Sequence, residues 1–365
     1  MTPIKVFVID DSAVVRQAMV HLLSNHPELV LIGTASNPLV AATAIKKNRP
    51  DVLLLDIEMP GMDGLTFLRQ IMAQDPIPTV ICSTLTCSGS QVALDALSSG
   101  AVSIIGKPAL GLKQFLEESR QELIQALKTA SRAKPKLRHA AHAHAHPHIP
   151  APITPSAQVA RPPAPASERS VHTFAVNKPV VIGSSTGGTQ ALELVLAALP
   201  ADAPGIAITQ HMPERFTAMY ADRLNGLCQM KVREARDGDR LERGLVLIAP
   251  GGRHMQLRKA AGQYYVKVFD GPPVNRHKPS VDVLFKSTAE AAGGDALALL
   301  LTGMGDDGAR GMKQMHDRGA RTIAQDEATC VVFGMPMEAI KLHAVDDVLP
   351  LHAMANAIMR FDAKA

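Results

Sequence analysis

The sequence predicts an α/β protein with two units, each built around a mainly parallel β-sheet. Three observations predict this fold class. Short apolar runs alternate with helical patterns along most of the chain, and a Pro-, Ala- and His-rich segment interrupts the alternation once. The length of 365 residues also exceeds the size at which a single hydrophobic core usually stops growing. We therefore assign residues 1–128 to a first unit, 129–176 to a flexible linker and 177–365 to a second unit.

Five apolar runs in the first unit are each followed by a helical pattern. The last of these helices is expected to start near Leu112, with Leu116, Leu123 and Leu127 on one stripe. Parallel neighbours in a sheet need a crossover segment, so repeated β–α units predict a doubly wound parallel sheet. The expected strands are Ile4–Ile9, Leu29–Ile32, Val52–Leu55, Thr79–Cys82 and Val102–Ile105.

The linker shows no helical or strand period, and it cannot bury enough apolar area to offset the cost of ordering its backbone. Its prolines favour an extended, semi-stiff chain. Five of its histidines have a spacing that a metal-binding tract could have, but a low-complexity linker accounts for them more simply. We expect no functional metal site at these positions, which are His139, His142, His144, His146 and His148.

The alternation of apolar runs and helical patterns resumes in the second unit. Helices are expected near residues 187–198, 213–225, 280–292, 308–317 and 350–360. An antiparallel pair is expected where Arg253–Arg258 and Tyr264–Phe269 flank the turn Ala261-Gly262. The other expected strands are Val180–Ile182, Ile206–Thr209, Leu245–Ile248, Ala298–Leu301 and Thr322–Ala324.

Composition excludes several classes of protein. A net charge of +4 with 3% aromatic residues gives no basic, aromatic platform for nucleic acid. The start of the chain has no signal-peptide pattern, and no apolar stretch is long enough to span a bilayer. We expect a cytoplasmic protein that neither binds nucleic acid nor inserts into a membrane.

Three acids of the first unit follow expected strands. Asp10 and Asp11 come directly after the first strand, and Asp56 comes directly after the third. The carboxyl ends of parallel strands meet at one edge of a sheet, where clustered carboxylates favour a hard divalent cation such as Mg²⁺. Ser83 and Lys107 follow the fourth and fifth strands, so this edge could hold a phosphoryl group on a central carboxylate.

These residues resemble the response-regulator receiver domain. The matching pieces are Asp10-Asp11, Asp56 with the following 59–64 segment Met-Pro-Gly-Met-Asp-Gly, Ser83, and Lys107-Pro108. The resemblance implies a flavodoxin-like sheet of strand order 2-1-3-4-5 and phosphorylation of Asp56 by a partner histidine kinase. It also implies that Asp10, Asp11 and Asp56 bind Mg²⁺ and that Ser83 and Lys107 contact the phosphoryl group.

Ser185 lies in Gly183-Ser184-Ser185-Thr186-Gly187-Gly188, between an apolar run and a helical pattern. Such a strand-to-helix turn fits the G-x-S-x-G pattern of a nucleophile elbow. Phosphate cradles and plain turns use similar glycines, so the motif alone leaves these alternatives open.

A histidine and two acids follow other expected strands of the second unit. His211 comes after Ile206–Thr209, and Asp306 and Asp307 follow Ala298–Leu301. Together with Ser185 they predict a Ser-His-Asp arrangement for acyl transfer, in which either acid could orient the imidazole. The chain order Ser, His, Asp differs from the Ser, Asp, His order of an α/β-hydrolase, so we do not expect that fold.

The second unit resembles the catalytic domain of the chemotaxis protein-glutamate methylesterases, and the order of receiver, linker and catalytic domain matches the whole family. The motifs that carry the resemblance are the segments 183–188, 210–213, 249–255, 279–282 and 301–308.

The resemblance implies a Rossmann-like catalytic domain with Ser185 as nucleophile, His211 as base and Asp307 as the acid. The backbone N–H groups of Thr186 and Met304 would form the oxyanion hole. The implied reaction is hydrolysis of glutamyl methyl esters on chemoreceptors, with deamidation of receptor glutamines, and it needs no cofactor for the ester chemistry. We expect the unphosphorylated receiver to cover the Ser185 site and phosphorylation to loosen this contact.

Two rival functions remain at this point. One is a phospho-regulated, nucleotide-sensing regulator without hydrolase activity, but no lysine follows the glycines of 183–188. The other is a DNA-binding response regulator, which would need a helix-turn-helix module that the Gly-rich strand ends do not provide.

Overall fold

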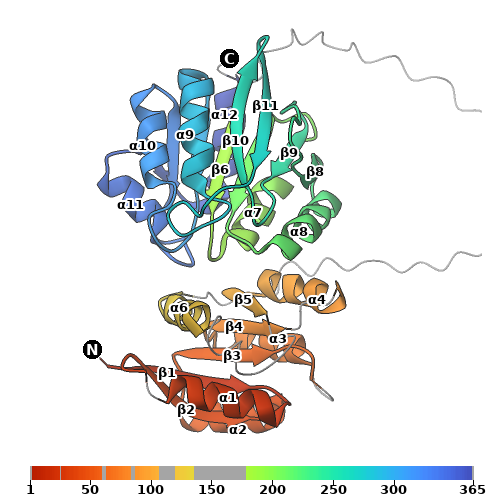
Figure 1. Cartoon of the computed structure of the whole chain (residues 1–365), viewed down its shortest axis with the longest axis vertical. Helices are drawn as coiled ribbons and strands as arrows, with labels where there is room; N and C mark the ends of the chain where they lie inside the picture. The colour runs from red at the N-terminus through yellow and green to blue at the C-terminus, as the bar shows by residue number, and fades with distance from the viewer. Residues whose placement is uncertain are drawn as a thin grey trace, which may run out of the picture.

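The computed structural model describes residues 2–24, 26–59, 63–83, 87–106, 120–134 and 178–363. They form two α/β units, with helix α4 (Cys87–Ser98) of the first unit against helices α7 (Gly188–Ala197) and α8 (Glu214–Leu227) of the second (Figure 1). Most of the segment assigned to the linker (129–176), namely residues 135–176 with its five histidines, lies outside the described residues.

The first unit contains a five-stranded parallel sheet of order β2-β1-β3-β4-β5, as predicted. Helices α2, α3 and α4 cover one face of the sheet, and α1 and α6 cover the other. The strands are β1 (Ile4–Ile9), β2 (Leu29–Ala35), β3 (Val52–Asp56), β4 (Thr79–Ser83) and β5 (Ser103–Gly106), and the helices besides α4 are α1 (Ala13–Leu23), α2 (Pro38–Lys47), α3 (Gly64–Gln74) and α6 (Arg120–Ser131).

Local sequence explains where these helices begin. Ser12, Asn37 and Asp63 cap α1, α2 and α3 by accepting hydrogen bonds from backbone N–H groups of the first turn. The expected start of the last helix near Leu112 lies outside the described residues, but Leu123 and Leu127 of α6 are fully buried as the apolar stripe predicts.

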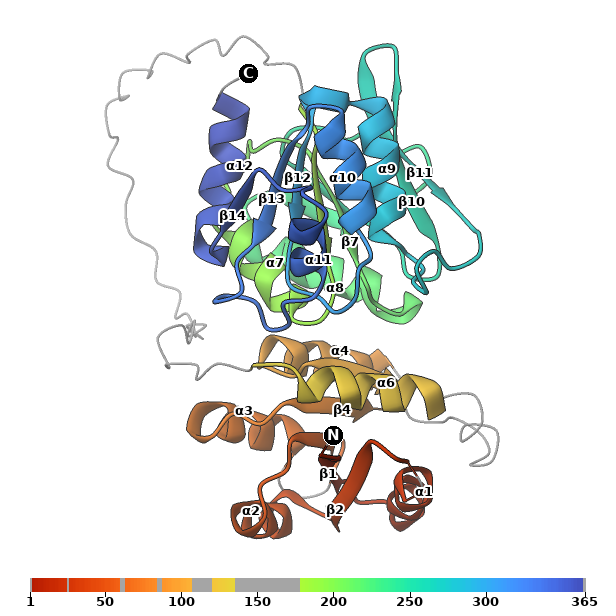
Figure 2. The same cartoon turned by 90° about the vertical axis from the view of Figure 1, so that its left-hand side faces the viewer.

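The second unit contains a seven-stranded parallel sheet of order β14-β13-β12-β6-β7-β9-β8. Helices α7, α8 and α12 pack on one face, while α9, α10, α11 and a separate hairpin pack on the other (Figure 2). The strands are β6 (Val180–Ser184), β7 (Ile206–Gln210), β8 (Lys231–Glu234), β9 (Leu245–Ile248), β12 (Leu297–Leu300), β13 (Arg321–Gln325) and β14 (Asp347–Leu349), and the remaining helices are α9 (Val281–Ala291), α10 (Ala309–Asp317), α11 (Met335–Lys341) and α12 (Met354–Ala363).

The predicted antiparallel pair is confirmed as the hairpin of β10 (His254–Ala260) and β11 (Gln263–Phe269). Ala261 and Gly262 join the two strands with φ values of 48° and 75°, the combination that suits the right-handed twist of a hairpin.

Strands β8 and β14 and helix α11 were not predicted. The β8 sequence Lys-Val-Arg-Glu is mostly charged and β14 has only three residues, because both strands lie at the edges of the sheet and bury few side chains.

The strand order places the middle of the sheet where the chain changes direction. From β6 the chain builds β7, β9 and β8 on one side and later returns to build β12, β13 and β14 on the other. In doubly wound sheets a crevice opens at the carboxyl ends of the strands at such a switch point. No described helix is both long and apolar enough to cross a membrane.

Candidate active site

The three predicted site residues of the second unit follow three adjacent strands. Ser185 comes directly after β6 and His211 directly after β7, while Asp307 lies in the loop after β12. Because these strands are parallel neighbours, their carboxyl ends bring the three residues to the switch point of the sheet.

The Ser185 turn is fixed by its backbone. The Ser185 N–H donates to the carbonyl of Thr302 at 3.0 Å, and the Ser185 carbonyl accepts from the N–H of Gly188 at 2.7 Å. Gly187 has a φ of 77°, and a Cβ there would lie 2.5 Å from the Val331 Cβ, so the position requires glycine.

Ser184 and Ser185 have different surroundings. The Ser184 side chain is fully buried and its hydroxyl donates to Oε1 of Gln210 at 2.6 Å. Ser185 instead lines a cavity of about 150 Å³ together with His211. Ser185, and not Ser184, therefore lines the same cavity as the His211 imidazole.

His211 is held by Asp307. The distance between His211 Nε2 and Asp307 Oδ2 is 2.8 Å, and the two side chains are 8% and 1% exposed. The other ring nitrogen, Nδ1, is buried and has no hydrogen-bond partner among the described residues. The ring thus has one nitrogen committed to Asp307 and one available in the interior of the site.

Asp307 accepts hydrogen bonds on both carboxylate oxygens. Asn275 Nδ2 and Ser280 Oγ each lie 2.8 Å from Oδ1, and the N–H of Val281 lies 2.7 Å from Oδ2. Burial alone raises the pKa of the Asp307 carboxyl, but the hydrogen bonds and the charge of His211 outweigh it and hold the pKa well below its usual range. Asp307 is therefore an anion at all ordinary pH values.

The structure brings Asp307, and not Asp306, to His211. Asp306 is half-buried, and its carbonyl accepts from the N–H of Ala309 at the start of α10. Of the two acids that the sequence left open, only Asp307 has the contacts that orient an imidazole.

A second buried acid, Asp282, binds the loop that carries Asp307. Asp282 is fully buried, and it accepts from the N–H groups of Gly308 and Gly311 at 3.1 and 2.7 Å. Its other oxygen accepts from Asn275 at 3.0 Å and pairs with Lys286 at 3.1 Å. Asn275 therefore bridges two buried carboxylates and fixes the loop that carries Asp307.

His277 covers one face of His211. The two rings stack with centroids 3.7 Å apart and planes 10° apart. Burial, followed by the nearby His211, lowers the pKa of His277 to about 4, so this ring is neutral at pH 7. Its turn contains two residues in the left-handed region, Asn275 and Arg276, with φ values of 49° and 70°.

Sequence reasoning missed Asn275, His277, Ser280 and Asp282 as parts of this site. Ser280 and Asp282 stood in a motif that carried the family resemblance, whereas Asn275 and His277 lie outside every motif named above. An acid directly after the Pro-Ser-Val run of 279–281 is the sequence signal that could have drawn attention to Ser280 and Asp282.

Of the two predicted oxyanion residues, Thr186 directly follows Ser185 in the chain. Thr186 lines the same cavity, and its carbonyl accepts from the Thr302 hydroxyl at 2.9 Å. Met304 lies in the loop after β12, where its thioether contacts the Thr129 hydroxyl of α6 at 2.6 Å.

The acids of the first unit also come together. Carboxylate oxygens of Asp10, Asp11 and Asp56 lie within 4.8 Å of one another, and Asp10 and Asp56 are buried whereas Asp11 is exposed. Three hard oxygen donors at this spacing fit a Mg²⁺ ion. Ser83 ends β4 and is buried, and Lys107 lies outside the described residues.

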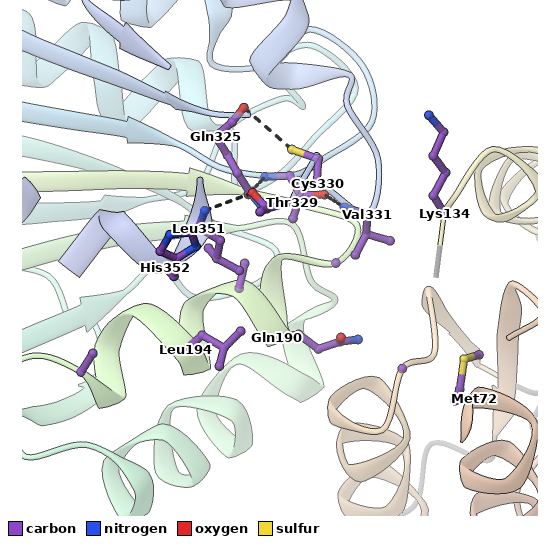
Figure 3. A pocket seen from close by; sticks show the side chains of 15 residues that line it. Met72, Lys134, Gln190, Leu194, Gln325, Thr329, Cys330, Val331, Leu351 and His352 are labelled. Atoms are coloured by element: carbon purple, nitrogen blue, oxygen red, sulfur yellow. Dashed lines mark hydrogen bonds between the residues drawn. The ribbon is translucent and has the colours of Figure 1, made fainter. Parts of the chain in front are cut away.

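The first unit lines part of the cavity around Ser185. Leu97, Val102, Ser103 and Ile104 line it from the side of α4 and β5, opposite Ser185 and His211. A second cavity of about 480 Å³ lies on the other side of the Gly187 turn. Figure 3 shows Met72 of α3 and Lys134, which follows α6, across this cavity from residues of the second unit, among them Gln190, Leu194 and Val331.

Comparison with known proteins matches both units. Residues 180–358 match the family model of the CheB methylesterases, and residues 6–128 match that of the response regulator receiver domain. A relative from Dechloromonas aromatica, named protein-glutamate methylesterase/protein-glutamine glutaminase 2, is 55% identical and covers 98% of each chain.

Two further similarities are to a curated relative and to a solved structure. A Geobacter metallireducens relative, named protein-glutamate methylesterase/protein-glutamine glutaminase 3, is 53% identical and covers 99% of each chain. The crystal structure of the Thermotoga maritima CheB methylesterase catalytic domain is 37% identical, with a TM-score of 0.49, and covers 50% of this chain and 98% of that one.

Proposed function

We propose that this chain, which belongs to the CheB methylesterase family, hydrolyses glutamyl methyl esters on chemoreceptors and deamidates receptor glutamines under the control of its receiver. The names of the relatives support both reactions, and the receiver match supports control by phosphorylation. The observation that carries the proposal is the 2.8 Å contact of His211 with Asp307, next to the cavity that His211 shares with Ser185.

The base in this proposal is Nδ1 of His211. Because Asp307 is ionised and lies against Nε2, the neutral ring carries its proton on Nε2 and keeps a lone pair on Nδ1. The Ser185 hydroxyl attacks the ester carbonyl as Nδ1 takes its proton, and Asp307 stabilises the imidazolium that forms.

The remaining steps follow from acyl transfer. The Thr186 and Met304 backbone N–H groups stabilise the oxyanion, and one such donor is typically worth about two to three orders of magnitude in rate. The imidazolium returns its proton to the leaving methoxide or amide nitrogen, which departs as methanol or ammonia. Water then attacks the acyl-serine with His211 as base, releasing glutamate and free Ser185.

The receiver supplies the control. In this proposal Asp56 accepts a phosphoryl group from a histidine kinase, Mg²⁺ is held by Asp10, Asp11 and Asp56, and Ser83 and Lys107 contact the phosphoryl oxygens. The bound Mg²⁺ would neutralise charge on the transferring phosphoryl group. The cluster of three carboxylates within 4.8 Å supports this assignment.

The contact between the units supports inhibition by the unphosphorylated receiver. Residues at α4 and β5 line part of the Ser185 cavity, so the receiver narrows the space through which a receptor segment would reach Ser185. Cavities of about 150 and 480 Å³ flank the Gly187 turn, so this interface lacks the dense packing of a protein core. Such an interface is readily displaced when the receiver changes conformation.

The nucleotide-sensing alternative is not supported. Both full-length relatives described above carry hydrolase names, and the turn after β6 is occupied by the Ser185 site.

The proposal is tested by weighing receptor fragments after incubation with the chain. Demethylation lowers the mass by about 14 Da per site, and deamidation raises it by about 1 Da, as the bond changes of acyl transfer require. We expect both changes with the activated wild-type chain. Unchanged receptor masses at every methylated and amidated site would contradict the proposed function.

A further inference from the structure

The last turn of α4 is bound to a polar cluster on α7 and α8. Gln190 Nε2 donates to the Leu97 carbonyl at 2.7 Å, and the Ser98 hydroxyl donates to Glu193 at 2.7 Å. Arg223 contacts Asp95 through Nη1 at 2.5 Å and Glu193 through Nε at 2.8 Å. Three residues near the end of α4 thus contact polar groups on two helices of the other unit.

This polar cluster lies beside the Ser185 cavity. Thr189 of α7 and Phe216 of α8 line the cavity, as does Leu97. Glu193 is one helical turn beyond Thr189, and Arg223 is two turns beyond Phe216, which places its backbone about 10 Å along α8 from the cavity. A helix that approaches Ser185 from this side of the cavity would therefore lie over the surface that α4 now covers.

The proposed chemistry places carboxylates on the substrate helix near the residue that reacts. Each turnover converts a neutral ester or amide into a carboxylate, so a receptor helix with several sites gains negative charge as it is processed. An arginine suits a carboxylate because its planar group offers several donors, and only Nε of Arg223 is bound to Glu193. When α4 leaves, the Nη1 group that holds Asp95 is released.

We infer that the α7–α8 surface with Arg223 binds the substrate helix, and that α4 with Asp95 occupies the substrate's place in the closed enzyme. Arg223 would then bind a carboxylate one or two turns away from the reacting residue. This inference rests on the proposed function, and it adds a residue that recognises the protein substrate outside the reacting groups.

If Arg223 only holds the two units together, the variants Asp95→Ala and Arg223→Ala should behave alike. In that case Asp95→Ala and Arg223→Ala remove the same contact and have the same consequences. If Arg223 also binds substrate, the two variants differ once the receiver is displaced. The pair is matched, since each variant breaks the contact from one side.

The experiment uses the full chain activated with acetyl phosphate and Mg²⁺. Its probe is a helical peptide with one glutamyl methyl ester and glutamates one and two turns away. Both variants are expected to raise activity without acetyl phosphate. In the activated state Arg223→Ala should raise KM about fivefold or more at nearly unchanged kcat, as loss of a partly buried charge pair predicts. Asp95→Ala should keep the wild-type KM.

A second peptide tests whether Arg223 acts on the flanking carboxylates. With alanine in place of the flanking glutamates, Arg223→Ala and wild type should have the same KM. Equal KM values for Arg223→Ala and Asp95→Ala on the acidic peptide would overturn the inference, as would an Arg223→Ala effect that persists on the alanine peptide.

Binding measured without turnover separates this inference from the proposed function. Fluorescence anisotropy of the acidic peptide on activated Ser185→Ala chains should show weaker binding when Arg223→Ala is added, but not when Asp95→Ala is added. If the activated wild-type chain releases no methanol but this difference in binding is observed, only the proposed function is refuted. If the activated wild-type chain releases methanol but Arg223→Ala and Asp95→Ala bind the peptide equally well, only the role of Arg223 is refuted.

Discussion

His211 Nε2 and Asp307 Oδ2 lie 2.8 Å apart, in a pair that is almost fully buried. The carboxylate is fixed independently of the imidazole, because Asn275, Ser280 and the N–H of Val281 also donate to it. A carboxylate held in this way cannot rotate freely, so it sets the orientation of His211 and leaves Nδ1 toward the interior of the site.

The adjacent acids Asp306 and Asp307 give a matched test of this pair. Asp307→Asn is expected to lower kcat for methyl ester hydrolysis by about three to four orders of magnitude, because the amide no longer selects the Nε2–H tautomer. Asp306→Asn should keep kcat within about tenfold of wild type. Methanol release by each purified variant measures both values, and similar losses in the two variants would remove Asp307 from its proposed role.

The adjacent serines give a second matched test. Ser185→Ala should abolish methanol release and keep the wild-type melting temperature, since its hydroxyl lines a cavity and is not buried in the core. Ser184→Ala should keep hydrolysis but lower the free energy of unfolding by about 1–3 kcal/mol, because Oε1 of the buried Gln210 loses the hydroxyl that donates to it. Loss of methanol release in Ser184→Ala, with release retained in Ser185→Ala, would refute the assignment of Ser185 as the nucleophile.

His277 predicts a dependence of stability on pH. Its pKa is lowered from 6.5 to about 4 by burial and by His211, so below pH 6.5 the unfolded chain takes up a proton that the folded chain does not. The corresponding stability is present above pH 6.5 and is lost as the pH falls toward 4. Its magnitude is at most about 3 kcal/mol.

The variant His277→Phe tests this dependence while keeping an aromatic ring over His211. Denaturant unfolding at pH 7 and pH 4.5 should show a smaller loss of stability in the variant than in wild type. Equal losses would mean that His277 does not titrate as its burial predicts.

The sequence predicted the elements that position the site better than the contacts within it. Apolar runs ending in Gly-rich or polar turns located β6, β7 and β12, and therefore Ser185 and His211, since a parallel sheet collects its strand ends. The choice of Asp307 over Asp306 depended on family resemblance, because both directly precede α10 and either could cap it.

Asn275 and His277 could not be predicted from pattern. They reach the site through a turn with two left-handed residues, and their partners Asp307 and His211 are far away in the chain. The presence of Leu97 and Ile104 in the cavity lining depends on how the two units meet, which no periodicity within either unit encodes.

The central claim is that Ser185 is a nucleophile whose access depends on phosphorylation of Asp56. The most direct test is the rate at which a bulky fluorophosphonate labels Ser185, located by peptide mass mapping, in wild type and in Asp56→Asn. We expect labelling of Ser185 to accelerate with acetyl phosphate and Mg²⁺ in wild type, and to stay slow in Asp56→Asn or with EDTA. Labelling at another residue, or equal acceleration in Asp56→Asn, would contradict the claim.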